Sequence, residues 1–222
     1  ELVCEGCGDC GVQSNCLSVL PRETAFGRKR TIDQSACNKD YSCLKGFCPS
    51  FVTVEGGRLR RSRAVQGDVA FAPLPEPVLP PLDQPWNTVI TGIGGTGVLT
   101  VSAILGMAAH LEGKGCTVLN LSGLAQKFGP VVSHVRIARR QPDIHAVRVA
   151  AGDADLLLGC DLVVSAAEDP LAKVNIERSH AVVNDFASPT AVFTRDPDAV
   201  FPAGSMKARI REEVGAGKTA FV

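Results

Sequence analysis

A short β-branched run leads directly into a glycine-rich turn in the stretch Thr88-Val89-Ile90-Thr91-Gly92-Ile93-Gly94-Gly95-Thr96-Gly97. Residues 98–113 follow with apolar side chains at helical spacing, and glycines close the segment. A strand that passes through a glycine turn into a helix is the opening unit of an α/β sheet. This stretch therefore decides the fold class that we predict.

Strand and helix patterns continue to alternate beyond this unit. Further strands are predicted at 116–119, 133–138, 161–165 and 181–184, and a helix at 168–179. Alternation of this kind is typical of a doubly wound, mostly parallel sheet, so residues 86–222 are expected to form a Rossmann-like α/β domain. No internal repeat is evident in the sequence.

The glycine spacing Gly92-x-Gly94-x-x-Gly97 predicts a phosphate site, because a helix that starts there offers free N–H groups. NAD-binding domains also carry an acid at the end of the second strand, and residues 119–122 contain none. NAD is therefore disfavoured. Two interpretations stay open: another phosphate-bearing ligand such as coenzyme A, or a tight strand-to-helix crossing with no ligand.

The loop after the second predicted strand is expected to share one rim with the glycine loop, because ligands bind at the carboxyl ends of strands. Basic side chains there are candidates to meet an anion. The alternatives are a half-buried, hydrogen-bonded strand histidine for His134 and a solvated loop lysine for Lys127. The candidate cofactor-binding residues are Gly92, Gly94, Gly95, Gly97, Lys127, His134 and Arg136.

Seven of the nine cysteines lie in the first 48 residues. Cys116 and Cys160 stand alone in apolar stretches and are expected to be buried small hydrophobes. The seven clustered cysteines are the candidate metal ligands. They are Cys4, Cys7, Cys10, Cys16, Cys37, Cys43 and Cys48.

The spacing Cys4-x2-Cys7-x2-Cys10 is typical of bacterial ferredoxins, in which close thiolates bind one corner of a cubane. Cys48-Pro49 supplies the Cys-Pro ending of that motif, and in two-cluster ferredoxins the fourth ligand comes from the distant motif. We therefore predict one [4Fe–4S] cluster on these four cysteines, within a ferredoxin-like segment at residues 1–55.

Cys16, Cys37 and Cys43 remain, and a second four-thiolate cluster needs an eighth cysteine. Three alternatives stay open for these cysteines: a three-iron cluster, a second cluster with a non-cysteine ligand such as Asp40, or no second cluster. Disulfides and a zinc site are the other interpretations of the segment. The odd cysteine count disfavours the first, and the triplet with a later Cys-Pro disfavours the second.

The bulk composition excludes several classes of function. The chain has 222 residues, with 23 basic and 23 acidic side chains, so its charge gives no case for nucleic acid or an anionic membrane. It has no apolar run long enough to span a bilayer. Neither an initiator Met, a signal peptide nor a closing signal is present, so we expect a fragment of a longer chain.

A proline-rich stretch separates the two predicted domains. Residues 56–85 are expected to be an extended surface linker. Arginines lie near its start, and a solvated turn is the simpler interpretation of them, with a docking patch for an acidic ferredoxin as the alternative. These arginines are Arg58, Arg60, Arg61 and Arg63.

Residues 4–16 and 37–51, with their cysteine spacing, resemble the large bacterial fused indolepyruvate:ferredoxin oxidoreductases. The glycine loop together with residues 123–136, Gly-Leu-Ala-Gln-Lys-Phe-Gly-Pro-Val-Val-Ser-His-Val-Arg, resembles the gamma domain of the 2-oxoacid:ferredoxin oxidoreductase superfamily. The two halves occur in the order of that family. The resemblance implies an iron–sulfur segment joined to a gamma domain that is truncated at its C-terminus.

The resemblance also implies a reaction. A 2-oxo acid is oxidatively decarboxylated on thiamine diphosphate, its acyl group passes to coenzyme A, and two electrons leave through iron–sulfur clusters to ferredoxin. No thiamine-binding signature is present here, so the thiamine-binding domains of the enzyme are expected elsewhere in the full chain. Reduced thiolates and the lack of an export signal predict a cytoplasmic location. A homodimer is expected by analogy. A non-catalytic electron-transfer module with a docking domain, and a zinc-stapled nucleotide-binding protein, are the alternatives.

Overall fold

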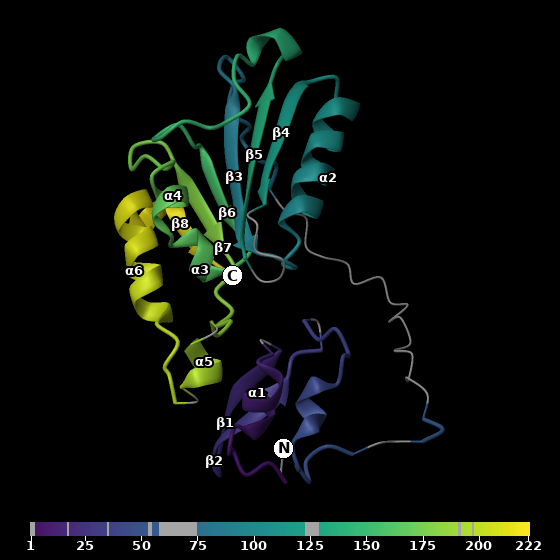
Figure 1. Ribbon diagram of the computed structural model, residues 1–222. Coiled ribbons are helices and arrows are strands. Elements are labelled where there is room, and N and C mark those ends of the chain that lie inside the picture. The colour runs from purple at the N-terminus through teal and green to yellow at the C-terminus, as the bar shows by residue number, and fades with distance from the viewer. Residues whose placement is uncertain are drawn as a thin grey trace. The chain divides into compact units, whose positions relative to one another are not determined.

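The computed structural model describes residues 3–16, 18–34, 36–52, 55–57, 75–122, 129–190, 192–196 and 198–222 (Figure 1). The chain divides into two compact units, Glu1–Pro81 and Leu82–Val222. The boundary falls in the stretch 56–85, for which the sequence predicts a linker. The four arginines of that stretch lie outside the described residues.

The second unit is built on a six-stranded sheet with the strand order β4-β5-β3-β6-β7-β8 (Figure 1). β3, β6, β7 and β8 pair in parallel, whereas β5 runs antiparallel to both β3 and β4. Five of the six strands therefore point the same way, which confirms the α/β class and the mostly parallel sheet. The strands are β3 (Trp86–Ile93), β4 (Gly115–Ser122), β5 (Pro130–Ala138), β6 (Leu156–Gly159), β7 (His180–Val183) and β8 (Thr219–Phe221).

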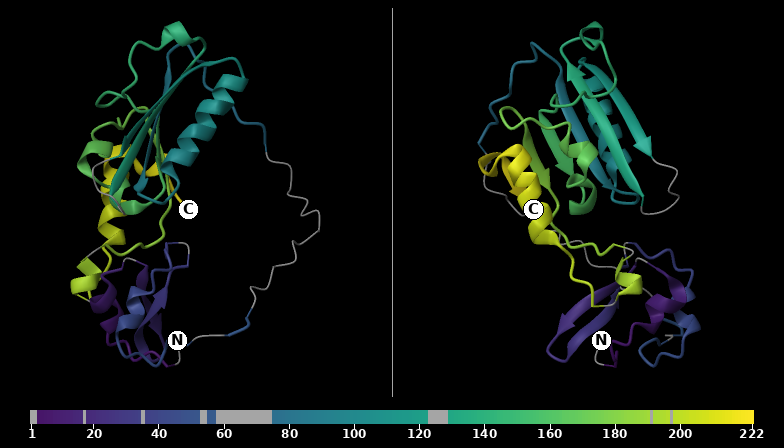
Figure 2. Two further views of the ribbon diagram at one scale, coloured as in Figure 1. Left: turned by 45° about the vertical axis from the view of Figure 1, so that its right-hand side comes forward. Right: turned by 60° about the vertical axis from the view of Figure 1, so that its left-hand side comes forward.

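Helices cover both faces of this sheet (Figure 2). α2 (Val98–Leu111) packs on β3, β4 and β5, while α3 (Leu162–Ser165) packs on β3 and β6 and contacts α6 (Ala203–Val214). The sheet is thus wound on two sides, as predicted. The remaining helices and 3₁₀ turns of the second unit are η2 (Gln141–Asp143), α4 (Glu168–Leu171), α5 (Val192–Arg195) and η3 (Ala216–Lys218).

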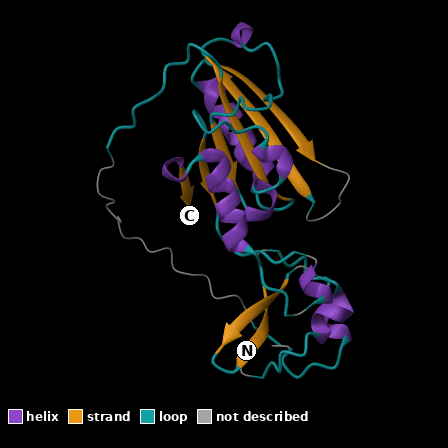
Figure 3. Cartoon of the chain, turned by 90° about the vertical axis from the view of Figure 1, so that its left-hand side faces the viewer, coloured by secondary structure: helices purple, strands orange, loops and turns teal. Residues whose placement is uncertain are grey.

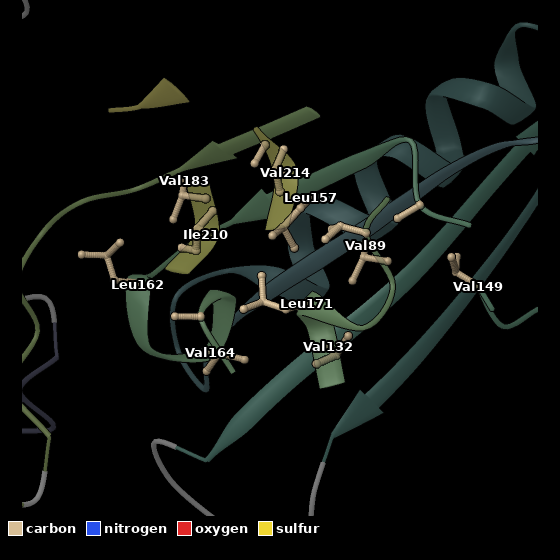
Figure 4. Packing of buried hydrophobic residues seen from close by; sticks show 14 residues of the cluster. Val89, Val132, Val149, Leu157, Leu162, Val164, Leu171, Val183, Ile210 and Val214 are labelled. Atoms are coloured by element: carbon tan, nitrogen blue, oxygen red, sulfur yellow. The ribbon is translucent and has the colours of Figure 1, made fainter. Parts of the chain in front are cut away.

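Neighbouring residues of β3 supply two separate apolar cores. Val89 belongs to the larger core, in which Leu157 and Ile210 are also fully buried (Figure 4). Ile90 belongs to the core under α2, together with Val135. Successive side chains of a strand point to opposite faces, so one β-branched run stabilises both layers.

The structure confirms most of the predicted elements of this unit and corrects two. The helix predicted at 98–113 is α2, and the strand predicted at 181–184 is β7, shifted by one residue. The strand predicted at 161–165 is wrong, because these residues form α3. Asp161 caps that helix by accepting a hydrogen bond from the Val164 N–H at 2.9 Å, and the strand of this region is β6, just before it.

The helix predicted at 168–179 is much shorter than expected. α4 ends at Leu171, and the chain then turns twice. The side chain of Asn175 accepts the N–H of Glu177 at 2.9 Å, and the Ser179 hydroxyl accepts the N–H of Asn175 at 2.7 Å. Such side-chain bonds offer the backbone an alternative to a helix, which explains the early end.

The first unit is small and irregular (Figure 3). It contains α1 (Asp9–Ser14), the hairpin strands β1 (Val19–Thr24) and β2 (Gly27–Ile32), and the 3₁₀ turn η1 (Ser42–Lys45). The hairpin is antiparallel, and α1 contacts η1. Sequence patterning did not predict the hairpin. In the part of the chain that the structure describes, no helix is long and apolar enough to cross a bilayer.

Candidate cluster-binding loops and glycine loop

The first cysteine loop, residues 4–10, has a backbone that only glycine adopts easily at two points. Gly6 and Gly8 have φ angles of 76° and 80°. The N–H of Gly6 donates to the sulfur of Cys4 at 3.4 Å. A Cβ at Gly6 would lie 2.4 Å from the carbonyl oxygen of Arg28, so the loop is held directly against β2.

Cys10, at the end of this loop, has two other cysteines as electrostatic neighbours. Burial raises the pKa of the Cys10 thiol, and the charges of Cys48 and Cys4 raise it further. The Gly11 N–H and the Arg30 guanidinium lower the pKa of this thiol. The first and last cysteines of the segment therefore lie near Cys10, although they are far apart in sequence. All three belong to the predicted ligand set, whose fourth member, Cys7, is exposed.

The three remaining cysteines form a second neighbourhood. Burial raises the pKa of the Cys43 thiol, and the charges of Cys16, Cys37 and Asp40 add to the increase. The sulfur of Cys37 accepts the N–H of Lys39 at 3.4 Å. Six of the seven cysteines thus fall into two groups of three.

Both groups have the donor chemistry that an iron–sulfur cluster requires. All nine cysteines are free thiols, and soft thiolates with N–H···S bonds are the usual surroundings of such clusters. Within the described residues, no three His, Cys, Asp or Glu side chains come together as a ligand set for a metal ion. A cubane is larger than an ion, because its inorganic core separates the four sulfurs that bind it.

In the second unit, the glycine loop has a structural reason for each of three glycines. A Cβ at Gly92 would lie 2.3 Å from Thr96 Oγ1 and 2.7 Å from Val98 Cγ2, so glycine allows α2 to start close to β3. Gly95 and Gly97 have φ angles of 102° and 92°. These positions favour glycine whether or not a ligand binds.

The rim around this loop is closed by hydrogen bonds from three segments. The N–H of Gly94 donates to the carbonyl of Gly129 at 2.8 Å, so the glycine loop and the start of β5 do share one edge. The buried Asp161 carboxylate accepts the N–H of Ile93 at 2.6 Å. Burial raises the pKa of the Cys160 thiol, and the charge of Asp161 adds to this. An acid and a thiol therefore lie beside the loop.

The structure separates the basic residues predicted for this rim. His134 pairs with Val89 in the middle of the sheet and is fully buried; its Nδ1 accepts the N–H of Val149 at 3.1 Å. Arg136 pairs with Asn87, near the opposite end of β3, and donates to its side chain at 2.8 Å. The structure therefore does not bring these two residues together at the glycine rim. Lys127 lies outside the described residues.

Comparison with known proteins decides the family. A family model described as pyruvate ferredoxin/flavodoxin oxidoreductase matches residues 87–213, which is more than half of the chain. The chain belongs to the pyruvate ferredoxin/flavodoxin oxidoreductase family. The match covers the glycine loop and most of the second unit, and does not include the cysteine segment.

Curated relatives of this oxidoreductase-family chain are named indolepyruvate oxidoreductase subunit IorB. The relative from Thermococcus kodakarensis is 38% identical over 35% of this chain and 37% of its own length. The relative from Methanothermobacter thermautotrophicus is 27% identical over 59% of this chain and 63% of its own length. The chain thus spans less than two thirds of these relatives. They are named as a subunit, and the fused form stays a prediction.

Solved structures of related oxidoreductases resemble the chain more weakly. Pyruvate oxidoreductase subunit PORC from Thermotoga maritima has a TM-score of 0.41 and 18% identity, and covers 63% of this chain and 62% of its own. The 2-oxoglutarate:ferredoxin oxidoreductase from Magnetococcus marinus, with 2-oxoglutarate, coenzyme A and succinyl-CoA bound, has a TM-score of 0.39 and 15% identity. It covers 59% of this chain and 23% of its own.

Sequence reasoning missed a polar cluster at the amino ends of β3 and β6 in this family domain. Asp155, 7% exposed, accepts the N–H of Asn87 at 2.8 Å and the Nε–H of Arg178 at 2.9 Å. Asp153 accepts from Arg178 at 3.1 Å and from the Asn87 side chain at 3.0 Å. These bonds join strands far apart in sequence, so no local pattern signals them. This polar cluster stabilises the sheet and lies at the opposite end of β3 from the glycine rim.

Proposed function

We propose that the chain is part of an indolepyruvate (2-oxoacid):ferredoxin oxidoreductase, with the first unit carrying electrons and the second unit forming the gamma domain. One observation carries the proposal. A domain of the pyruvate ferredoxin/flavodoxin oxidoreductase family is joined to a segment in which six of the seven cysteines fall into two neighbourhoods. The names of the curated relatives support indolepyruvate as the substrate.

The proposed reaction is balanced by two one-electron acceptors. A 2-oxo acid, coenzyme A and two oxidised ferredoxins give an acyl-CoA, carbon dioxide, two reduced ferredoxins and one proton. The bond between the carboxylate carbon and the carbonyl carbon breaks, and a thioester bond forms. Thiamine diphosphate, when bound elsewhere in the enzyme, supplies the chemistry of the carbon–carbon cleavage.

In this chain the first cysteine group would hold one [4Fe–4S] cluster through Cys4, Cys7, Cys10 and Cys48. Two features of the protein would favour the reduced, more negative cluster: the N–H···S bond from Gly6 and the nearby charge of Arg30. Hydrogen bonds to sulfur and nearby charge are the means by which proteins set cluster potentials.

The outer face of α2 supports a role within a larger assembly. Leu99, Ile104 and Met107 are 47%, 61% and 57% exposed, and Leu111 at the end of the helix is 78% exposed. A helix that is apolar all round is usually buried, and neighbouring exposed apolar side chains mark an interaction surface. We assign as partners the thiamine-binding domains of the same enzyme, with ferredoxin as electron acceptor and a homodimer as the full assembly. The free thiols fit a reducing, cytoplasmic compartment.

The test is anaerobic reconstitution of the chain with ferrous iron and sulfide. We expect a brown protein with visible absorption and about four irons and four sulfides for each cluster. Cys10→Ser should remove about four irons per chain, and the matched control Cys116→Ser should remove none. A colourless protein that retains stoichiometric zinc contradicts the iron–sulfur assignment.

The catalytic part of the proposal has its own test. The chain alone, with added thiamine diphosphate and indolepyruvate, is not expected to release carbon dioxide. Together with the thiamine-binding domains, it should pass electrons from the 2-oxo acid to ferredoxin, and Cys10→Ser should abolish that transfer. Decarboxylation by the isolated chain contradicts the assignment of this chain as a non-thiamine part of the enzyme.

A further inference from the structure

The two cysteine loops, residues 4–10 and 37–43, share the spacing Cys-x5-Cys and also match in backbone conformation at two positions. Each loop begins with a cysteine whose sulfur accepts the N–H of the residue two positions on, at 3.4 Å in both cases. That residue has a positive φ angle in both loops: 76° at Gly6 and 58° at Lys39. The chain therefore wraps around Cys4 and Cys37 in one manner.

The match continues through the rest of each loop. The residue four positions on is again left-handed, with φ angles of 80° at Gly8 and 56° at Tyr41, and it is the N-cap of α1 or η1. A cysteine follows in the first turn of each helix, Cys10 in one and Cys43 in the other. Lys39 and Tyr41 keep this geometry without glycine, at a cost of about 1 kcal/mol or more each.

The position three residues after the first cysteine differs between the loops. In the first loop it is Cys7, and in the second it is Asp40. Asp40 Oδ1 accepts the N–H of Ser42 at 3.1 Å and its hydroxyl at 2.9 Å, which fixes the carboxylate at the start of η1. A carboxylate thus stands where the matching loop has a thiol.

The fourth ligands follow from the same symmetry. In two-cluster ferredoxins each motif lends its last cysteine to the other cluster. Cys48, the last cysteine of the second motif (residues 37–48), is a neighbour of Cys10, and Cys16, the last cysteine of the first motif (residues 4–16), is a neighbour of Cys43. The exchange expected between the motifs is therefore present in both directions.

We propose that the first unit holds a second [4Fe–4S] cluster on Cys16, Cys37, Cys43 and the carboxylate of Asp40. This inference rests on the proposed electron-transfer function and names a site within it. A carboxylate is a harder ligand than a thiolate and binds iron less tightly in a cluster. The iron at Asp40 is therefore the one that leaves first.

The consequence is a reversible loss of one iron. Ferricyanide removes one electron from the oxidised four-iron cluster, which then releases one ferrous ion and becomes an oxidised three-iron cluster; ferrocyanide is the other product. Added ferrous iron and a reductant reverse the step. The first cluster, with four cysteines, should resist the same treatment.

The experiment uses the whole chain, reconstituted anaerobically and then treated with one equivalent of ferricyanide. We expect about eight irons before treatment and about seven after it, with the sharp paramagnetic resonance signal of a three-iron cluster. Asp40→Cys should retain about eight irons and lose that signal, whereas Asp40→Ala should hold about seven irons from the start. Glu23→Ala, an exposed acid of the same unit, is the matched control and should behave as the wild type.

The outcomes separate this inference from the proposed function. A chain that binds about four irons, unchanged by Cys16→Ser, overturns the second cluster and leaves the first intact. A three-iron signal that persists in Asp40→Cys overturns Asp40 as the ligand. One zinc ion lost on Cys16→Ser overturns the cluster at this site. A chain that binds no iron at all contradicts the proposed function itself.

Discussion

The two units of the chain differ in the size of their apolar cores. The second unit has two apolar cores, and in the larger of them Val89, Leu157 and Ile210 are fully buried. In the first unit, among the residues that the structure describes, the buried apolar side chains are Val19 and Leu20. A segment of this size with so small a core needs disulfides, a metal or a partner to fold. We therefore expect cofactor ligands to stabilise the first unit, whereas side-chain packing stabilises the second.

Removal of the clusters should have the largest effect, and it should be confined to one unit. A chelator under reducing conditions is expected to lower the amide-exchange protection of residues 4–48 by at least about 100-fold, or about 2.7 kcal/mol, because structural metals contribute folding free energy directly. The amide-exchange protection of the second unit should not change. The single tryptophan, Trp86, lies in β3, and the single tyrosine, Tyr41, lies beside η1, so their fluorescence reports the two units separately. Equal protection before and after chelation would show that the first unit folds without a cofactor.

A cavity in the larger core should give the opposite pattern. Leu157 is fully buried, so Leu157→Ala is expected to lower the free energy of unfolding of the second unit by about 2–5 kcal/mol. Urea denaturation followed by Trp86 emission measures this, and the iron content should not change. The control is Leu111→Ala, at a side chain 78% exposed, with an expected change within about 0.5 kcal/mol. A loss of iron in Leu157→Ala would show that the units are coupled.

Two glycines of the first unit offer a matched pair with a smaller effect. Gly6→Ala places a Cβ against the Arg28 carbonyl at a positive φ angle, and should destabilise the first loop by about 1–3 kcal/mol. Gly11 lies within α1 with no heavy atom within 4 Å of an added Cβ, so Gly11→Ala should stabilise the helix by about 0.5–1 kcal/mol. The midpoint of iron loss to a chelator measures both. If the two variants lose iron at the same chelator concentration, the close approach of Gly6 to β2 does not contribute to the stability of the first loop.

The same contrast between the units explains what the sequence could predict. Strand β3, helix α2 and strand β7 follow from local periodicity, because their apolar faces meet a core. The hairpin of β1 and β2 was missed, because its Ala25-Phe26 turn lacks the Asn-Gly or Asp-Gly pair that signals such turns. Helix α3 was mistaken for a strand, because the Asp161 cap and the short strand β6 were not distinguished from one apolar run.

The candidate sites show a similar division. Cysteine spacing was enough to propose the ligand set of the first cluster, because three of its cysteines lie in one short loop and the Cys-Pro ending marks the fourth. The second loop has the same Cys-x5-Cys spacing, but Lys39, Asp40 and Tyr41 share no residue type with Gly6, Cys7 and Gly8, so the sequence left Asp40 as one of several alternatives. The likeness lies in the φ angles. The positions of His134 and Arg136 depend on strand register, which the sequence pattern did not fix.

The smallest expected effect is a pH dependence that belongs to the second unit alone. Burial lowers the pKa of His134, and the charges of Arg148 and Lys173 lower it further, against a weaker opposite effect of Asp169. The imidazole is therefore neutral in the folded chain, where its Nδ1 accepts the Val149 N–H. In the unfolded chain it binds a proton below pH about 6.5.

Since the unfolded state then binds more protons, the stability of the second unit should be full above pH about 6.5 and fall below it, by up to about 1.4 kcal/mol per pH unit. Urea denaturation between pH 7.5 and 5.5, followed by Trp86 emission, measures the slope. His134→Gln should flatten it, because the amide can accept the Val149 N–H without titrating. His180→Gln, at an exposed histidine in β7, should leave the slope unchanged. A slope that survives in His134→Gln would assign the pH dependence to other groups.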